Sequence, residues 1–235
     1  FLVVRTPSSS SLPHASFPSV PLWRSAMSSS VACQTCHIPE YAKQTKTTTR
    51  WDWSRSGEPS KMIEESDQKT KKINKKKGLL VREKGLTPSY DWYNGKHQRY
   101  LKGDPVNLEG VTYLNPPMGD INDPAAKITP YKLMKSKVPA DKKLEQLIVP
   151  KLHNGYFTNY DWQEAAKKGM KAAGLDFSGE ITFVETVMHW RLNHEIAPKQ
   201  DALSCLDCHG TKGVMDFKAL GYKGDPAVTG GRSLK

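Results

Sequence analysis

Two segments of the chain carry apolar residues at the three- and four-residue spacing of an amphipathic helix. The first runs from Trp162 to Ala173 and is followed by Gly174, a common helix stop. Its apolar positions are Trp162, Ala165, Ala166, Met170 and Ala173. The second runs from about Gly179 to Asn193, before Pro198, with apolar positions at Ile181, Val184, Val187, Met188 and Leu192. The pattern predicts two helices.

The remainder shows no convincing strand alternation, because Gly and Pro interrupt each would-be period. Residues 57–77 are charged and rich in lysine, and we expect them to form an exposed loop or hairpin. The sequence therefore predicts a mainly α fold with extensive irregular structure.

The first thirty residues differ from the rest of the chain. They hold ten serines, and no Asp or Glu occurs before Glu40. They lack the apolar run and cleavage site of a clear secretory signal. We expect residues 1–30 to be an unrelated or disordered leader, and residues 31–235 to form the functional region.

All four cysteines lie in two C-x-x-C-H motifs, Cys33/Cys36/His37 and Cys205/Cys208/His209. Two thiols three residues apart lie on one side of a helical turn and can add to the vinyl groups of a haem, whose iron the adjoining His ligates. We therefore expect two covalently bound c-type haems. Hydrophobic residues make up only 37% of the chain, and the flat apolar porphyrins would fill part of its interior.

Two alternatives for these motifs are a zinc site and a dithiol redox pair. A four-cysteine zinc ribbon places its C-x-x-C pairs roughly 15–20 residues apart, whereas nearly the whole chain separates these. A thioredoxin-type C-x-x-C belongs to a βαβ pattern, which neither motif has.

Each iron needs a sixth ligand or an open position. Among the other histidines, His194 is the preferred distal ligand because it follows the apolar stripe and precedes Pro198. His189 could ligate or contact a propionate, and the weaker candidates are His14, His97 and His153. Candidate propionate partners are Arg191, Arg99 and Lys132. Four tryptophans are expected to pack in the core and not to act as electron relays: Trp51, Trp53, Trp92 and Trp190.

The formal net charge is +11. Most lysines are scattered, and the propionates of two haems would offset part of the excess, so we expect an anionic substrate or an acidic redox partner instead of nucleic acid. No window approaches the 18 or more apolar residues of a membrane-spanning helix.

Several strings, most of them outside the haem motifs, resemble the C-terminal part of the octahaem cytochromes c called tetrathionate reductases. They include CQTCHIPEYA at 33–42, WDWS at 51–54, WYNG at 92–95, residues 179–198, DFKALG at 216–221 and residues 224–232. The family's pattern makes His37 and His209 proximal ligands and His194 a distal ligand. His189 stands before Trp190 where relatives tend to have Tyr, and the region of His153 does not align cleanly, so neither inherits a role.

The resemblance implies a periplasmic multihaem reductase related to the hydroxylamine oxidoreductase group, with tetrathionate, nitrite or hydroxylamine as substrates. The family's catalytic haem belongs to the upstream region, so this chain would be an electron-transferring C-terminal part without the active site. Its partners would be the remaining haem-bearing part of the parent protein or separate redox proteins. The resemblance is also compatible with a homo-oligomer. The alternatives are a stand-alone dihaem carrier and a structural member of a cytochrome filament.

Overall fold

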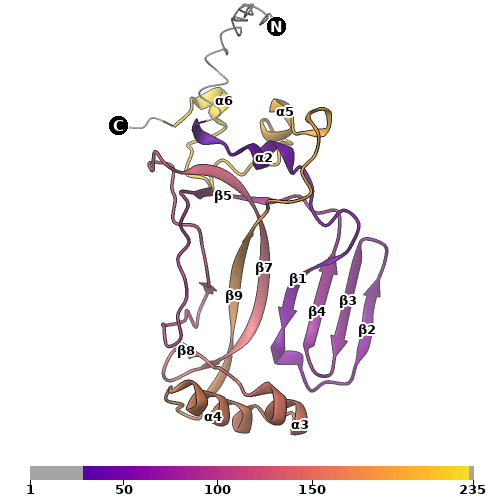
Figure 1. Ribbon diagram of the computed structural model, residues 1–235, viewed down its shortest axis with the longest axis vertical. Helices are drawn as coiled ribbons and strands as arrows, with labels where there is room; N and C mark the ends of the chain where they lie inside the picture. Colours follow the sequence, from indigo (N-terminus) through magenta and orange to yellow (C-terminus); the bar gives the residue numbers. More distant parts are fainter. Residues whose placement is uncertain (1–28, 233–235) are drawn as a thin grey trace, which may run out of the picture.

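A mixed sheet of nine strands organises the computed structural model, which describes residues 29–232 (Figure 1). Seven strands follow the order β2-β3-β4-β1-β7-β9-β6, and β5 and β8 both pair with β7. The strands are β1 Thr47–Asp52, β2 Lys61–Glu65, β3 Lys69–Asn74, β4 Gly78–Glu83, β5 Ser89–Tyr93, β6 Val111–Tyr113, β7 Lys127–Asp141, β8 Gln146–Leu147 and β9 Ile181–Arg191. The prediction of a mainly α protein is therefore wrong.

The helices are short and lie at the two ends of the molecule (Figure 1). One end holds the two segments with the C-x-x-C-H motifs, and the other holds the longest helix, α4. The α-helices are α2 Cys33–His37, α3 Phe157–Asn159, α4 Trp162–Ala173, α5 Cys205–Cys208 and α6 Pro226–Thr229. The other turns are η1 Trp53–Arg55, η2 Leu152–Tyr156 and η3 Lys199–Asp201.

The predicted helix at 162–173 is confirmed as α4. The Asp161 carboxylate accepts hydrogen bonds from the amides of Gln163 and Glu164 and so caps its start, and Gly174 ends it in the left-handed conformation. Its buried side packs Ala166 and Met170 against Ile148. The local signals sufficed here because cap, stripe and stop all lie within the helix itself.

The predicted helix at 179–193 is wrong, because this segment forms strand β9. Residues Ile181–Arg191 pair antiparallel with β7 along the whole strand, from Asp141↔Ile181 to Tyr131↔Arg191. On its other side, Glu185 to Val187 pair in parallel with β6. Many of its residues are β-branched or aromatic, which favours a strand. Its apolar residues do not alternate cleanly because both faces of the strand are partly buried, as Val184 and Val187 show.

The prediction of a loop or hairpin at the lysine-rich segment 57–77 is confirmed, but only one of its strands is fully exposed, since β3 is half-buried and Ile73 is buried. The hairpin consists of β2 and β3, which pair antiparallel at the end of the sheet that lies away from β9. Every residue of β2 is exposed. The expected leader lies almost wholly outside the described residues, and so does His14. No helix within residues 29–232 is long and apolar enough to cross a membrane.

A buried carboxylate fixes the turn that follows β7. Asp141 has no exposed surface, and it accepts hydrogen bonds from the amides of Lys143, Leu144 and Ser178 and from the Ser178 hydroxyl. Burial alone would raise the pKa of Asp141, but these four donors outweigh it and lower the pKa below the usual carboxyl value. The ionised form therefore holds β7 to the segment that precedes β9.

We expect Asp141→Asn to lower the free energy of unfolding by about 2 kcal/mol, because a buried amide with one acceptor oxygen cannot accept from all four donors and loses the charge that strengthens these hydrogen bonds. Since the pKa in the folded state is lowered, the stabilisation is present above the pKa of the unfolded carboxyl and disappears as the pH falls through the folded one. Urea unfolding of both proteins at neutral and acidic pH measures the effect. The exposed Asp176→Asn is the control, and an equal loss in both variants would contradict the prediction.

Candidate haem site

The first C-x-x-C-H motif forms the short helix α2, which is tied to the sheet by its middle residue. Thr35 is fully buried, and its hydroxyl donates to the carbonyl oxygen of Ile128 in β7 at 2.7 Å. Cys33 is exposed and Cys36 partly exposed, and both thiols are free. Because residues three apart share one side of a helix, the two thiols are available together for thioether bonds.

The imidazole of His37 is oriented by a backbone carbonyl. His37 Nδ1 lies 2.9 Å from the carbonyl oxygen of Ala197, and the Ala197 amide donates in return to the His37 carbonyl at 2.7 Å. A carbonyl can only accept, so Nδ1 carries the proton and Nε2 of the neutral ring keeps a lone pair. Iron-ligating histidines have this arrangement.

The second motif forms α5, where Ser204 and Asp207 make a capping box. Cys205 is exposed and Cys208 partly exposed. His209 Nδ1 lies 2.5 Å from Asp225 Oδ1, and the ring of Phe217 stacks on the imidazole at 4.9 Å between centroids. His209 therefore also directs its Nδ1 to an acceptor and leaves Nε2 for a metal.

The chain folds back tightly after the second motif. A Cβ atom on Gly213 would lie 2.4 Å from the carbonyl oxygen of Cys208 and 2.9 Å from the amide nitrogen of His209. The Gly213 amide bonds to the carbonyl of Gly210 at 3.1 Å. Only glycine fits this close approach, so the chain at Gly213 packs directly against the backbone of Cys208 and His209.

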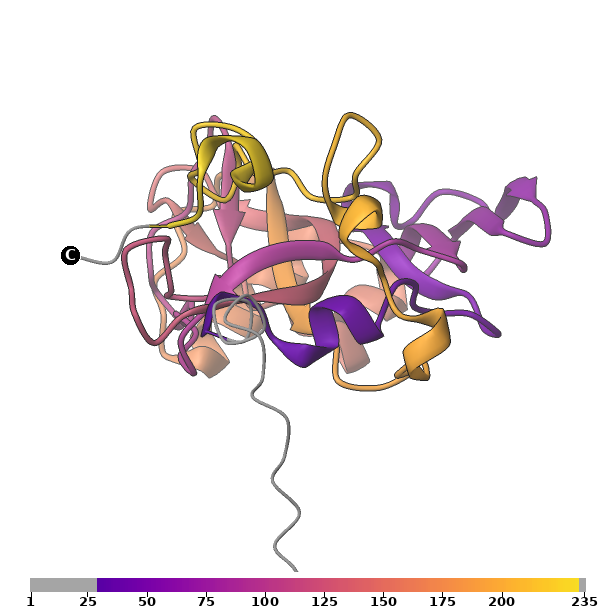
Figure 2. The same ribbon diagram turned by 90° about the horizontal axis from the view of Figure 1, so that it is seen from above.

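The two motifs lie side by side, although nearly the whole chain separates them in sequence (Figures 1 and 2). The Leu203 amide, just before α5, donates to the carbonyl of Cys36 at 2.9 Å. Burial raises the pKa of Cys208 to about 11, with a smaller contribution from Cys36, and the pKa of Cys36 is also raised, mainly by burial and then by Cys205. The thiols are therefore close enough to influence one another.

A buried tyrosine hydroxyl lies near both motifs. Tyr90 Oη has no hydrogen-bond partner among residues 29–232. The pKa of Tyr90 is raised, chiefly by desolvation and then by the nearby thiols of Cys208 and Cys36. A buried hydroxyl without a partner is uncommon, and this one lies beside thiols of both motifs. The residues present thus fit two neighbouring haems in donor set, in tautomer and in this unpaired hydroxyl.

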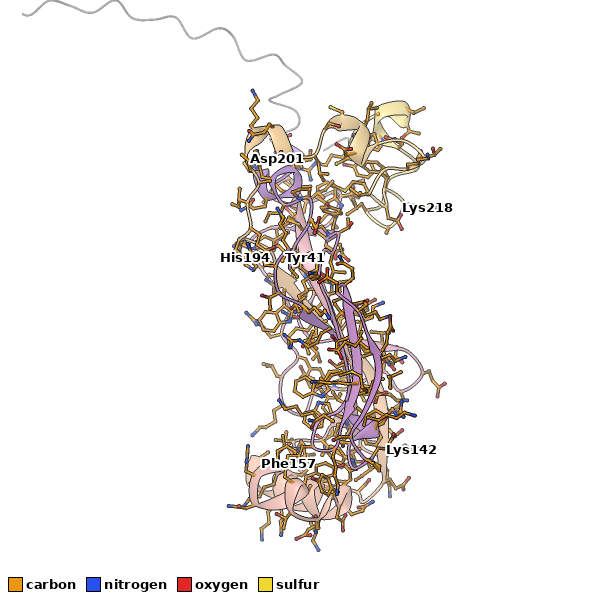
Figure 3. The ribbon with its side chains drawn as sticks, turned by 90° about the vertical axis from the view of Figure 1, so that its right-hand side faces the viewer. Tyr41, Lys142, Phe157, His194, Asp201 and Lys218 are labelled. Atoms are coloured by element: carbon orange, nitrogen blue, oxygen red, sulfur yellow. The ribbon has the colours of Figure 1, made fainter. Side chains whose placement is uncertain are left out.

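His194 lies beyond the end of β9, exposed, in the loop that leads to Ala197. It lines a cavity of about 590 Å³ together with Tyr41, and Figure 3 shows the two residues at the same level of the molecule. Two of the three predicted propionate partners, Arg191 and Lys132, line the same cavity. The third, Arg99, lies near His97, where its charge helps to lower the pKa of that imidazole after the larger effect of burial.

The remaining histidines are away from the motifs or enclosed. His189 is buried in β9, its Nε2 lies 3.4 Å from Asp91 Oδ2, and its Nδ1 has no partner among the described residues. His97 Nε2 lies 3.4 Å from the hydroxyl of Tyr131. His153 packs edge-on against Phe157, which Figure 3 places at the end opposite His194 and Asp201. No three His, Cys, Asp or Glu residues within 29–232 are grouped to hold a metal ion by themselves.

Sequence reasoning missed Asp225, the Ala197 carbonyl and Tyr90. Asp225 stands sixteen residues after His209 in a Gly-Asp-Pro string, where the local signal is a helix cap and not a histidine partner. A backbone carbonyl such as that of Ala197 leaves no mark in a sequence. A sequence motif therefore cannot identify these three groups as part of the site.

A sheet that brings two C-x-x-C-H segments together, each with its histidine held through Nδ1, defines a c-type cytochrome. The chain belongs to the bacterial cytochrome c family, which matches residues 48–212. The matched range includes the second motif and begins after the first. Membership implies covalently bound haem c and haem-based electron transfer.

Among solved structures, the chain is similar to the octaheme cytochrome c from Shewanella oneidensis. The two are 42% identical, with a TM-score of 0.84 over 92% of this chain and 51% of that one. The chain thus spans about half the length of that octaheme cytochrome. Comparison with curated proteins gave no match.

Proposed function

We propose that this chain carries two c-type haems, attached at Cys33/Cys36/His37 and Cys205/Cys208/His209, and passes electrons between them. The observation that carries the proposal is the contact of the two motifs through Leu203 and Cys36. Each histidine has its Nδ1 occupied by an acceptor, so each Nε2 can ligate iron. When bound, the haems supply one-electron chemistry, and the protein supplies attachment, axial ligands and spacing.

We propose further that the chain is the C-terminal part of an octahaem reductase exported to the periplasm. The similarity to an octaheme cytochrome over about half of that chain supports this. Tetrathionate, with nitrite or hydroxylamine as alternatives, is the proposed substrate of the parent, and its catalytic haem would lie in the upstream part. The remaining haem-bearing part is then the immediate partner. The excess positive charge suits the two anions among these substrates, tetrathionate and nitrite.

His194 is the proposed distal ligand. It is exposed, and it shares a cavity with the cationic side chains of Lys46, Arg82 and Lys132. Such cations stabilise propionates, so the cavity has the ligand and the charge that a haem edge requires. A haem held by the upstream part would fit this arrangement as well as one held by this chain.

The second candidate is a stand-alone dihaem electron carrier. The neighbouring motifs favour it as much as they favour the reductase part, because both need a haem pair. The coding sequence upstream of residue 31 separates them. Six further C-x-x-C-H-like motifs there support the reductase part, and a signal peptide that starts the gene near Ser30 supports the carrier.

The haem count of the matured chain tests the proposal. Expression of the full chain with a c-type maturation system is expected to give a polypeptide heavier by two haems, and a pyridine haemochrome assay is expected to give two haems per chain. Mass spectrometry under denaturing conditions measures this, because thioether bonds survive denaturation. A product with the bare polypeptide mass and four free thiols would refute the proposal.

A further inference from the structure

The two proximal histidines differ in the group that accepts their Nδ1 proton. The partner of His37 is neutral, the backbone carbonyl of Ala197 at 2.9 Å. The partner of His209 is the side-chain carboxylate of Asp225 at 2.5 Å. The two sites otherwise have the same donors, two thiols and an imidazole in one short helix and its end.

Asp225 is held in place by the backbone around it. Its Oδ2 accepts from the amide of Gly210 at 2.7 Å, and its Oδ1 accepts from the amide of Ala227 at 2.9 Å. The side chain is about one-fifth exposed, and no lysine or arginine within residues 29–232 forms an ion pair with it. The negative charge therefore acts on the imidazole and is not neutralised by a lysine or arginine.

A carboxylate on Nδ1–H increases the electron density of an imidazole more than a carbonyl does, because the negative charge attracts the proton more strongly. A more electron-rich ligand stabilises ferric iron relative to ferrous iron. Hydrogen bonds to an axial ligand are accordingly one of the means by which a protein sets the potential of a haem. The stacked ring of Phe217 restricts rotation of the imidazole and so keeps Nδ1 directed at Asp225.

We propose that Asp225 is a positioning residue that acts through His209 to lower the reduction potential of the haem at the second motif. This inference rests on the proposed attachment of haem at both motifs. An electron shared by the pair is then biased toward the iron beside His37. With haem bound at both motifs, one electron would leave the iron beside His209 and enter the iron beside His37, while Asp225 would keep the proton on His209 Nδ1.

The test is the potential of the second haem in Asp225→Asn. The measurement uses the full chain, matured with haem, in a spectroelectrochemical titration. The same substitution in a Cys33→Ala/Cys36→Ala background leaves one haem and so assigns the potential without ambiguity. We expect reduction of the second haem to become at least tenfold more favourable, about 59 mV for one electron, with the first haem unchanged.

The direction of the shift separates this role from a merely structural one. If the substitution only loosened the site, water would enter and stabilise the more highly charged ferric form, which lowers the potential. Loss of the carboxylate raises it. Asp225→Ser is a second neutral variant that keeps a helix-capping oxygen for the amide of Ala227, in case Asp225→Asn fails to retain haem. Asp225→Glu keeps the charge and should retain most of the low potential.

Asp216→Asn is the matched control. Asp216 is a nearby carboxylate whose Oδ1 accepts from the amide of Ala219 at 2.9 Å, and within residues 29–232 it forms no hydrogen bond or ion pair with His209. An equal shift in Asp216→Asn, an unchanged potential in both neutral variants, or a fall in potential would overturn the proposal. If this chain without any substitution attaches fewer than two haems, the proposed function itself fails. If two haems attach and the potential does not respond, only the role of Asp225 fails.

Discussion

Replacing Cys205 and Cys208 together by alanine is expected to remove one of the two proposed haems and leave the other covalently attached. The two thioether bonds of a c-type haem come from the cysteines of one motif, and the second motif has both in α5. Without them, His209 alone cannot retain a haem through denaturation. Denaturing mass spectrometry should show a single haem, and the haemochrome assay should give half the parent value.

The reciprocal double variant, Cys33→Ala/Cys36→Ala, is expected to give the same count from the other motif. Leu206→Ala is the control within α5, because Leu206 lies between the two cysteines and is 83% exposed. It should keep both haems. Retention of two haems by either double variant would show that the attachment residues are assigned wrongly. Loss of both haems from one double variant would show that the remaining motif cannot receive a haem by itself.

The largest expected effect on stability is that of Gly169→Ala in α4. Helix propensity alone favours alanine over glycine by about 1 kcal/mol. In the folded protein, however, a Cβ at Gly169 would lie 1.9 Å from the carbonyl oxygen of Val149 and 2.6 Å from the amide nitrogen of Lys151. This backbone is itself bonded to the helix, since the Lys151 amide donates to the carbonyl of Ala165 at 3.0 Å. We expect a loss of about 3 kcal/mol.

Gly174→Ala, at the end of the same helix, is the matched control. A Cβ there meets no atom within 4 Å, but the backbone has φ +69°, which costs an alanine about 1 kcal/mol. Urea unfolding followed by circular dichroism measures both variants against the parent. A Gly169→Ala protein as stable as the parent would show that α4 does not pack against residues 149–151 in solution.

The fold was predictable from the sequence where its determinants were local. The helix from Trp162 to Ala173 has its cap, apolar stripe and glycine stop within fourteen consecutive positions. The hairpin of β2 and β3 is likewise made by neighbouring segments. Strand β9 was mistaken for a helix because it shows no clean alternation of apolar and polar residues. Both of its faces are partly buried, with Val184 and Thr186 on one face and Val187 and His189 on the other. Strand β7, which pairs with β9, was missed because it contains Pro130 and Pro139, and proline is unusual inside a strand.

The sequence by itself determined the chemistry of this protein: two C-x-x-C-H motifs that use every cysteine, and the histidine beside each. Tertiary structure alone decided that the motifs meet, that Ala197 orients His37, and that Asp225 orients His209. The physical reason is the range of the interactions. Attachment of a haem needs residues within one helical turn. The contacts that orient the two histidines span more of the chain, 160 residues from His37 to Ala197 and 16 from His209 to Asp225, so they depend on how the chain folds back.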